Sequence, residues 1–134
     1  MFRLVINEEI WKPVVGYEGF YEVSNKGNVA SLIFKGKQRR KKMKLTFHHC
    51  GYVYSHLFNG KIKNIFVHRL VAMAFPEICG EWFEGATVDH LNGIKTDNRA
   101  VNLKVCTLKE NMSNPVTRQK HIEAAINNLN HIRH

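Results

Sequence analysis

Three stretches near the middle of the second half decide the fold: Val88-Asp89-His90, Asn102-Leu103 and Thr107-Leu108-Lys109-Glu110-Asn111. They bring one carboxylate, one imidazole and two amides into residues 89–111, with Asn92-Gly93 between the first two stretches. Two short strands are predicted at residues 87–91 and 103–106, and the polar loop between them is rich in asparagine. Thr107 and Glu110 match a capping box, which predicts a helix that starts at Leu108 with Asn111 in its first turn.

This set of side chains suits one hard metal ion with a water beside it. Asp89 offers a charged oxygen and Asn111 a neutral one, which leaves most of the coordination shell to water and phosphate, as Mg²⁺ prefers; Mn²⁺ accepts the same ligands. His90 has the right ordinary pKa for a general base. Asn102, across the hairpin, is predicted to accept a hydrogen bond from the idle ring nitrogen of His90. Asn92 and Asn98 are interpreted as turn residues.

Adjacent strand residues point to opposite faces, so Asp89 and His90 do not share a site on a regular strand. The interpretation therefore requires either a bend at the end of this strand or a metal that bridges to the scissile phosphate from one side. A structural role for an isolated Asp-His pair remains the alternative.

The composition indicates a basic globular protein with an anionic partner. The chain has 134 residues, 20 Lys plus Arg against 11 Asp plus Glu, and a net charge of +9. Nucleic acid is the common partner of such a chain. The 3 cysteines form no C-x-x-C pair, which favours a reducing, intracellular location. We expect no membrane span.

The first half of the chain is predicted to form antiparallel hairpins. Turn residues at 24–28 separate two apolar runs, and Asn59-Gly60 marks a second hairpin between strands at 52–58 and 62–66. Apolar residues at i, i+3, i+4 and i+7 from Val67 then predict a short helix, which Pro76 ends. Residues 77–87 are predicted to form a loop.

A basic run precedes the second hairpin, and its members are candidate nucleic-acid contacts: Lys37, Arg39, Arg40, Lys41, Lys42 and Lys44. The run is either a solvated loop or an edge that follows phosphates. His68 and Arg69, at the start of the predicted helix, are weaker candidates for phosphate contact; packing or capping for His68 and a plain surface charge for Arg69 are the alternatives. In the tail, residues 122–129 show a helical stripe that either docks on the core or touches DNA.

These residues resemble the HNH endonuclease family, in its phage and intron-encoded branch. The resemblance implies a cytoplasmic location in a bacterium or a phage-infected host. The resemblance rests on residues 67–75, Val88-Asp89-His90-Leu91-Asn92-Gly93, residues 95–103 and residues 107–111. Residues 10–29 are similar to a small module that often precedes the HNH unit. The resemblance implies an α+β protein with N-terminal antiparallel hairpins, a short helix, a ββα-metal motif and a C-terminal helix. It implies three parts: 8–45, a β-rich module associated with DNA binding; 46–112, the nuclease domain; and 113–134, a helical tail.

The roles implied by the resemblance agree with the chemistry above. Asp89 and Asn111 would bind Mg²⁺ or Mn²⁺, His90 would be the general base, and Asn102 would orient His90. The expected activity is metal-dependent hydrolysis of double-stranded DNA, by a monomer or a homodimer. A DNA-binding protein on a degenerate HNH scaffold is the main alternative, and a basic structural protein that binds RNA is another.

Overall fold

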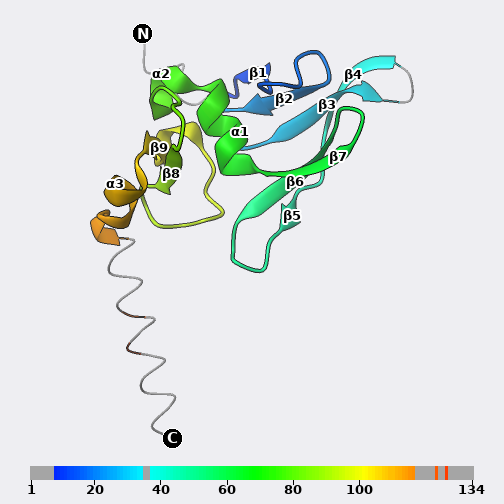
Figure 1. Ribbon diagram of the computed structural model, residues 1–134. Coiled ribbons are helices and arrows are strands. Elements are labelled where there is room, and N and C mark those ends of the chain that lie inside the picture. Colours follow the sequence, from blue (N-terminus) through cyan, green and yellow to red (C-terminus); the bar gives the residue numbers. More distant parts are fainter. Residues whose placement is uncertain (1–7, 35–36, 117–122, 124–125, 127–134) are drawn as a thin grey trace, which may run out of the picture.

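The computed structural model describes residues 8–34, 37–116, 123 and 126. It confirms an α+β fold with antiparallel strands first and a strand–helix unit after them (Figure 1). The expected tail helix at 122–129 lies outside the described residues, apart from 123 and 126. No helix of the described part is long and apolar enough to cross a bilayer.

The first sheet contains four antiparallel strands in sequence order: β1 (Trp11–Pro13), β2 (Tyr21–Ser24), β3 (Val29–Phe34) and β4 (Lys37–Lys42). The predicted turn at 24–28 joins β2 to β3. The part of the basic run from Lys37 to Lys42 forms the edge strand β4 instead of an irregular loop. Its backbone is thus ordered by pairing with β3 along one side.

The second sheet contains β5 (Thr46–Phe47), β6 (Val53–Phe58) and β7 (Ile62–Phe66), with the Asn59-Gly60 turn between the last two as predicted. Along β6, Val53, Ser55 and Leu57 are buried, and the alternate residues are half-buried or exposed. This period-2 pattern shows that one face of the sheet packs on the core and the other meets solvent.

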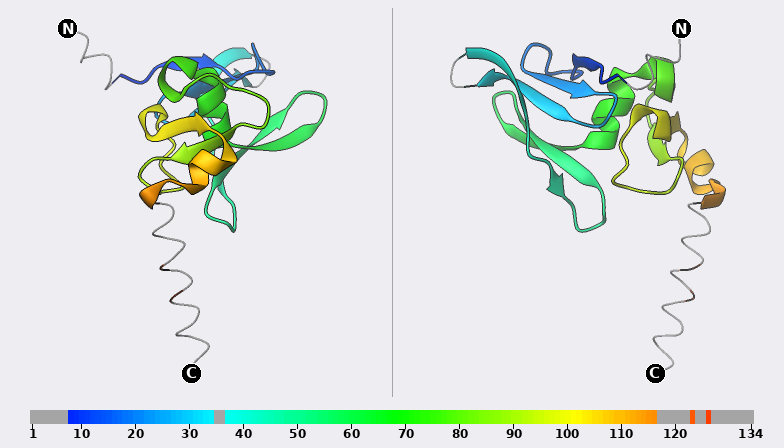
Figure 2. Two further views of the ribbon diagram at one scale, coloured as in Figure 1. Left: turned by 60° about the vertical axis from the view of Figure 1, so that its left-hand side comes forward. Right: turned by 180° about the vertical axis from the view of Figure 1, so that it is seen from behind.

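Helix α1 (Val67–Ala74) follows β7 directly and lies between the two larger sheets and the last hairpin (Figures 1 and 2). Its apolar stripe, which includes Val67, Leu70 and Val71, is buried in one core shared with Val23, Leu57 and Leu103. The N-terminal strands and the C-terminal unit are therefore packed as one body.

Pro76 does not simply end this helix. Helix α1 ends at Ala74, and Pro76 is the first residue of a second short helix, α2 (Pro76–Cys79), where a missing backbone N–H has no cost. The prediction of a loop from residue 77 was wrong to this extent.

The last unit is the predicted hairpin and capped helix: β8 (Thr87–His90), the 3-10 turn η2 (Ala100–Asn102), β9 (Leu103–Cys106) and α3 (Leu108–Met112). Strands β8 and β9 are antiparallel, with His90 opposite Leu103. Both bonds of the Thr107–Glu110 capping box are present. Helix α3 packs against β8.

The turn after β2 supports the loop of the last hairpin. Gly27 has φ +89°, and a Cβ built on it would lie 3.0 Å from the Asn98 Cβ and 3.1 Å from its carbonyl oxygen. Beside it, the Ala100 amide donates to the Asn25 carbonyl at 2.8 Å. A side chain at position 27 would push the loop away from the N-terminal sheet.

We predict that Gly27→Ala lowers the free energy of unfolding by about 2–4 kcal/mol, because strain at positive φ and overlap with Asn98 add together. Gly16→Ala is the matched control, since Gly16 has φ +88° and open space around it. It should lose only the strain contribution, about 1 kcal/mol. Urea unfolding of the two variants measures the difference, and equal losses would contradict the close approach.

Candidate metal and nuclease site

The two carboxylate oxygens of Asp89 lie in different surroundings. The residue is 6% exposed. Its Oδ2 accepts a hydrogen bond of 2.6 Å from the Asn114 amide, while Oδ1 is buried without a partner among the described residues. Because an unpaired buried carboxylate oxygen is costly, this atom is a natural place for a cation.

Asn111 faces the hairpin from helix α3. Its Nδ2 donates to the Thr87 hydroxyl at 3.3 Å and to the Val88 carbonyl at 3.2 Å. The amide is thereby anchored through its nitrogen, and its oxygen accepts no hydrogen bond from the described part of the chain. The sequence left the direction of Asn111 open, and the structure turns it toward the strand that carries Asp89.

These two side chains fit a hard divalent ion that keeps much of its water. The fit rests on the orphaned Asp89 oxygen and on the chemistry of one carboxylate and one amide oxygen. No group of three or more His, Cys, Asp or Glu side chains that could hold a metal occurs within the described residues. A closed structural metal site is therefore not found in that part of the chain.

His90 is the last residue of β8, and a turn follows at once, since the Gly93 amide donates to the His90 carbonyl at 2.8 Å. The residue is 6% exposed. Burial lowers the pKa of His90, although Asn98, Asp89 and Asp97 act in the opposite direction. The ring is therefore neutral at neutral pH and able to accept a proton.

The partner of the His90 ring is Asn98, not Asn102. His90 Nε2 lies 2.9 Å from Asn98 Oδ1. Because a carboxamide oxygen only accepts, Nε2 carries the proton and the lone pair of the neutral ring is on Nδ1. The interpretation of Asn98 as a turn residue missed this contact, since three nearby asparagines look alike in sequence.

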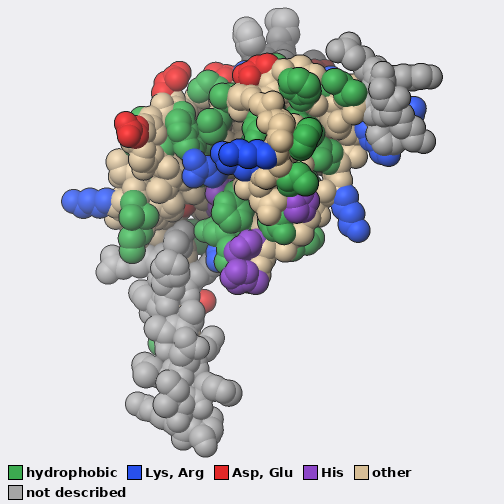
Figure 3. Space-filling view, turned by 45° about the vertical axis from the view of Figure 1, so that its right-hand side comes forward, with side chains coloured by type: hydrophobic (Ala, Val, Ile, Leu, Met, Phe, Trp, Pro, Cys, Tyr) green, Lys and Arg blue, Asp and Glu red, His purple; other side chains and the backbone are tan. Residues whose placement is uncertain are grey.

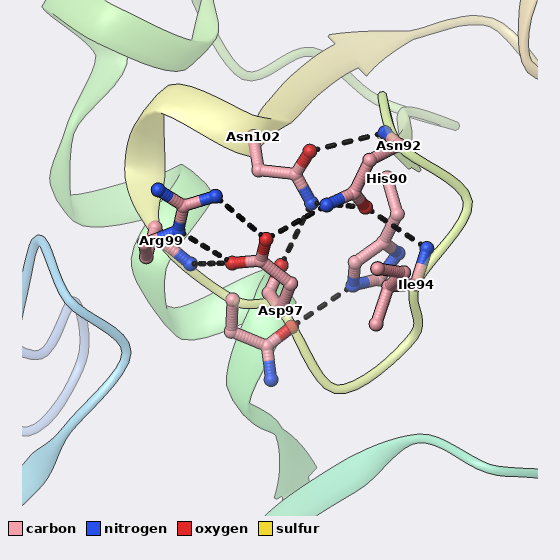
Figure 4. Close-up of polar contacts among 7 residues, drawn as sticks. His90, Asn92, Ile94, Asp97, Arg99 and Asn102 are labelled. Atoms are coloured by element: carbon pink, nitrogen blue, oxygen red, sulfur yellow. Dashed lines mark hydrogen bonds and ion pairs between the residues drawn. The ribbon is translucent and has the colours of Figure 1, made fainter.

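Asn102 instead closes the loop between β8 and β9 (Figure 4). Its Oδ1 accepts a hydrogen bond of 3.0 Å from the backbone N–H of Asn92. Its Nδ2 donates to Asn92 Oδ1 and to the backbone carbonyl of Asp97, each at 2.9 Å. The expected contact from Asn102 to His90 is therefore corrected. Asn102 acts on the backbone of the loop, and Asn98 acts on the ring.

Aromatic rings enclose His90 on its other sides. Tyr52 stacks on it at a centroid distance of 5.8 Å, and His68 meets it edge-on at 5.1 Å. His68 is 9% exposed and stacks on Phe66, and burial lowers its pKa to about 3. His68 lies inside α1 and makes no side-chain cap. Its burial favours the packing role over the phosphate contact expected for it.

The ring cluster continues onto the outer face of the second sheet. Figure 3 shows histidine side chains among hydrophobic ones on one face of the molecule. A hollow of about 410 Å³ beside the second sheet is lined by His48, Tyr54, Asn64 and Phe66. Because Phe66 also stacks on His68, this hollow adjoins the ring cluster around His90.

The candidate basic contacts differ in what surrounds them. Arg40 binds Glu22 at 2.8 Å and lies over the Trp11 ring, and Lys42 is 3.6 Å from Glu9. Arg69 is exposed and lies over the Trp82 ring at 5.2 Å. Arg39, Lys41 and Lys44 are exposed, and Lys37 lies in the same edge strand. The structure leaves their contact with nucleic acid as a prediction.

Comparison with known proteins follows the same division of the chain. A model of the NUMOD4 motif matches residues 9–58, and a model of the HNH endonuclease family matches residues 65–113. A solved structure that describes DNA binding and cleavage by the HNH homing endonuclease I-HmuI matches with a TM-score of 0.69 and 39% identity, over 89% of this chain and 68% of that one. The chain belongs to the HNH endonuclease family. The resemblance drawn from the sequence is thus confirmed.

Two relatives are similar to this HNH family member in sequence. DNA endonuclease I-HmuI of Bacillus phage SP01 is 41% identical over 109 residues, which are 81% of this chain and 58% of the relative. An uncharacterized HNH endonuclease of Acanthamoeba polyphaga mimivirus is 35% identical over 127 residues, which are 86% of this chain and 28% of the relative. The chain therefore spans little more than half of the first relative and under a third of the second.

The Asp97–Arg99 ion pair stabilises the loop between β8 and β9. It also makes the stability of the protein depend on pH. Hydrogen bonds from Arg99 lower the pKa of Asp97 from 3.8 to about 2. A lowered folded-state pKa adds stability that is present above the unfolded value and is lost as the pH falls toward the folded one.

We predict that Asp97→Asn costs about 1 kcal/mol of unfolding free energy above pH 4, after a discount for solvent screening because Arg99 is exposed. The difference from wild type should shrink between pH 4 and pH 2. Chemical unfolding at several pH values measures it, and a difference that stays constant down to pH 2 would count against the ion pair.

Proposed function

We propose that the protein is a Mg²⁺- or Mn²⁺-dependent endonuclease that hydrolyses phosphodiester bonds of double-stranded DNA, with His90 as general base. The observation that carries the proposal is the buried Asp89 Oδ1, which has no partner in the described part of the chain and lies next in sequence to a neutral histidine with one ring nitrogen engaged. Membership of the HNH endonuclease family supports it, as does the similarity to I-HmuI, a DNA endonuclease.

The reaction requires a water to lose a proton while negative charge grows on the phosphate. His90 Nδ1 holds the lone pair that takes this proton, because Nε2 is committed to Asn98. Tyr52 and His68 pack against the ring and hold it in place. Asp89 and Asn111 would bind the divalent ion, which supplies charge neutralisation at the phosphate and the leaving oxygen.

Basic side chains supply the affinity for DNA in this proposal. The net charge of +9 favours a polyanion, and the exposed Arg39, Lys44 and Arg69 present charge to solvent. Contacts of this kind follow phosphates and carry no sequence information. Arg40 and Lys42 would have to exchange their carboxylate partners for phosphate, so they are weaker contributors.

We predict that the purified protein nicks or linearises supercoiled plasmid with Mg²⁺ or Mn²⁺ and that EDTA stops it. His90→Ala should slow cleavage by about 10²–10⁴-fold, because the proton acceptor is gone, with DNA affinity nearly unchanged. His56→Ala, an exposed histidine on β6, is the control and should cut like wild type. Wild-type protein that never cuts, or a His90→Ala variant that cuts at full rate, would overturn the proposal.

Substitution of Asn98 and of Asn102 should have different effects, the first on the rate of cleavage and the second on stability. Asn98→Ala should lower the single-turnover rate by about 10–100-fold through a misplaced ring. Asn102→Ala should lower the unfolding free energy by about 2–3 kcal/mol, because buried loop amides lose their partner. Rates are measured at a temperature where both variants are folded. A larger rate loss in Asn102→Ala than in Asn98→Ala would reverse the two roles.

A further inference from the structure

Asn114 touches the carboxylate of the candidate metal ligand from outside the HNH hairpin. It follows α3, is half-buried, and donates through Nδ2 to Asp89 Oδ2 at 2.6 Å. Its Oδ1 accepts from the Val116 amide at 2.9 Å. One atom must donate to a carboxylate and the other must accept from an amide, so these contacts fix the orientation of the side-chain amide.

The second contact places Asn114 at the start of a helical turn. Pro115 and Val116 have helical backbone, and an asparagine that accepts from the amide two residues on is a regular N-cap, with proline at the first helical position. The cap holds the Asn114 backbone in place. The Nδ2 group is therefore presented to Asp89 from a fixed position.

The two carboxylate oxygens of Asp89 therefore differ in their hydrogen bonding. Oδ2 is occupied by Asn114, and Oδ1 is buried without a partner among the described residues. Asn111 is treated in the same way, with its nitrogen anchored to Thr87 and Val88. Each candidate ligand thus has one polar atom fixed by the protein and one oxygen left for a cation.

We propose that Asn114 is a positioning residue of the metal site, which holds Asp89 so that only Oδ1 is offered to the divalent ion. This inference rests on the proposed function, because it takes Asp89 as a metal ligand. Partners of this kind orient metal-binding carboxylates, and their loss usually weakens metal binding about 10–100-fold. Asn114 touches neither the substrate nor the reacting water in this account.

The test is Mn²⁺ binding by the full chain, without DNA, followed by calorimetry or by the loss of the free-ion EPR signal. Asn114→Ser keeps a good N-cap but removes the donor to Asp89, and we expect the Mn²⁺ dissociation constant to rise about 10–100-fold. Asn114→Thr likewise keeps a cap acceptor and lacks the amide donor to Asp89, so we expect a similar rise. Ser113→Ala, which removes a neighbouring bond to the Lys109 carbonyl, should bind as wild type does.

A second measurement distinguishes weaker metal binding from a general loss of stability. It is the rise in melting temperature that Mn²⁺ causes in each variant, relative to that variant's own metal-free value. This rise should shrink in both Asn114 variants and stay unchanged in Ser113→Ala. If Asn114→Ser and Asn114→Thr bind Mn²⁺ within twofold of wild type, the positioning role is overturned while the proposed function stays intact. Wild-type protein that binds no Mn²⁺ overturns both.

Discussion

A buried carboxylate with one unpaired oxygen is the constraint on which the site depends. Asp89 is almost fully buried, and among the described residues only its Oδ2 has a hydrogen-bond partner. Leaving a buried polar atom unpaired costs about 1–3 kcal/mol, and more for a charged one, so the surrounding structure must hold it there. The β8–β9 pairing, the capped helix α3 and Asn114 do so together. The same cost disappears when a cation binds, which is why this atom points to a metal site.

The general base is held by a second, independent set of contacts. His90 leaves the strand on which Asp89 lies and reaches Asn98 in the loop, Tyr52 beside β6 and His68 in α1. The Asn98 backbone in turn meets Gly27 of the N-terminal turn. The N-terminal strands therefore do more than add charge: they support the loop that fixes the ring. This arrangement explains why the two matched motifs share one core.

Local signals in the sequence predicted the elements well. The Asn59-Gly60 turn, the apolar stripe from Val67 and the Thr107–Glu110 box each depend on residues a few positions apart, and each is found in the structure. The role of Pro76 was misjudged, because a proline that stops one helix also suits the first position of the next.

Side-chain partners were harder to predict, because they depend on the path of a loop. Asn92, Asn98 and Asn102 offer the same amide, and only the fold decides that Asn98 meets the ring while Asn102 binds the loop backbone. Asp89 and His90 were expected to need a bend in the strand. The strand ends at His90, and the two side chains have different partners. Asn114 was missed because its sequence signal, an asparagine before proline, indicates only a turn or cap.

The most direct test of the account is a crystal structure of the protein grown or soaked with Mn²⁺, with anomalous data collected for manganese. The account predicts one anomalous peak with Asp89 Oδ1 and Asn111 Oδ1 both about 2 Å away, and Asp89 Oδ2 still bound by Asn114. A manganese ion bound elsewhere, or bound to Asp89 through Oδ2 with the Asn114 contact broken, would contradict it.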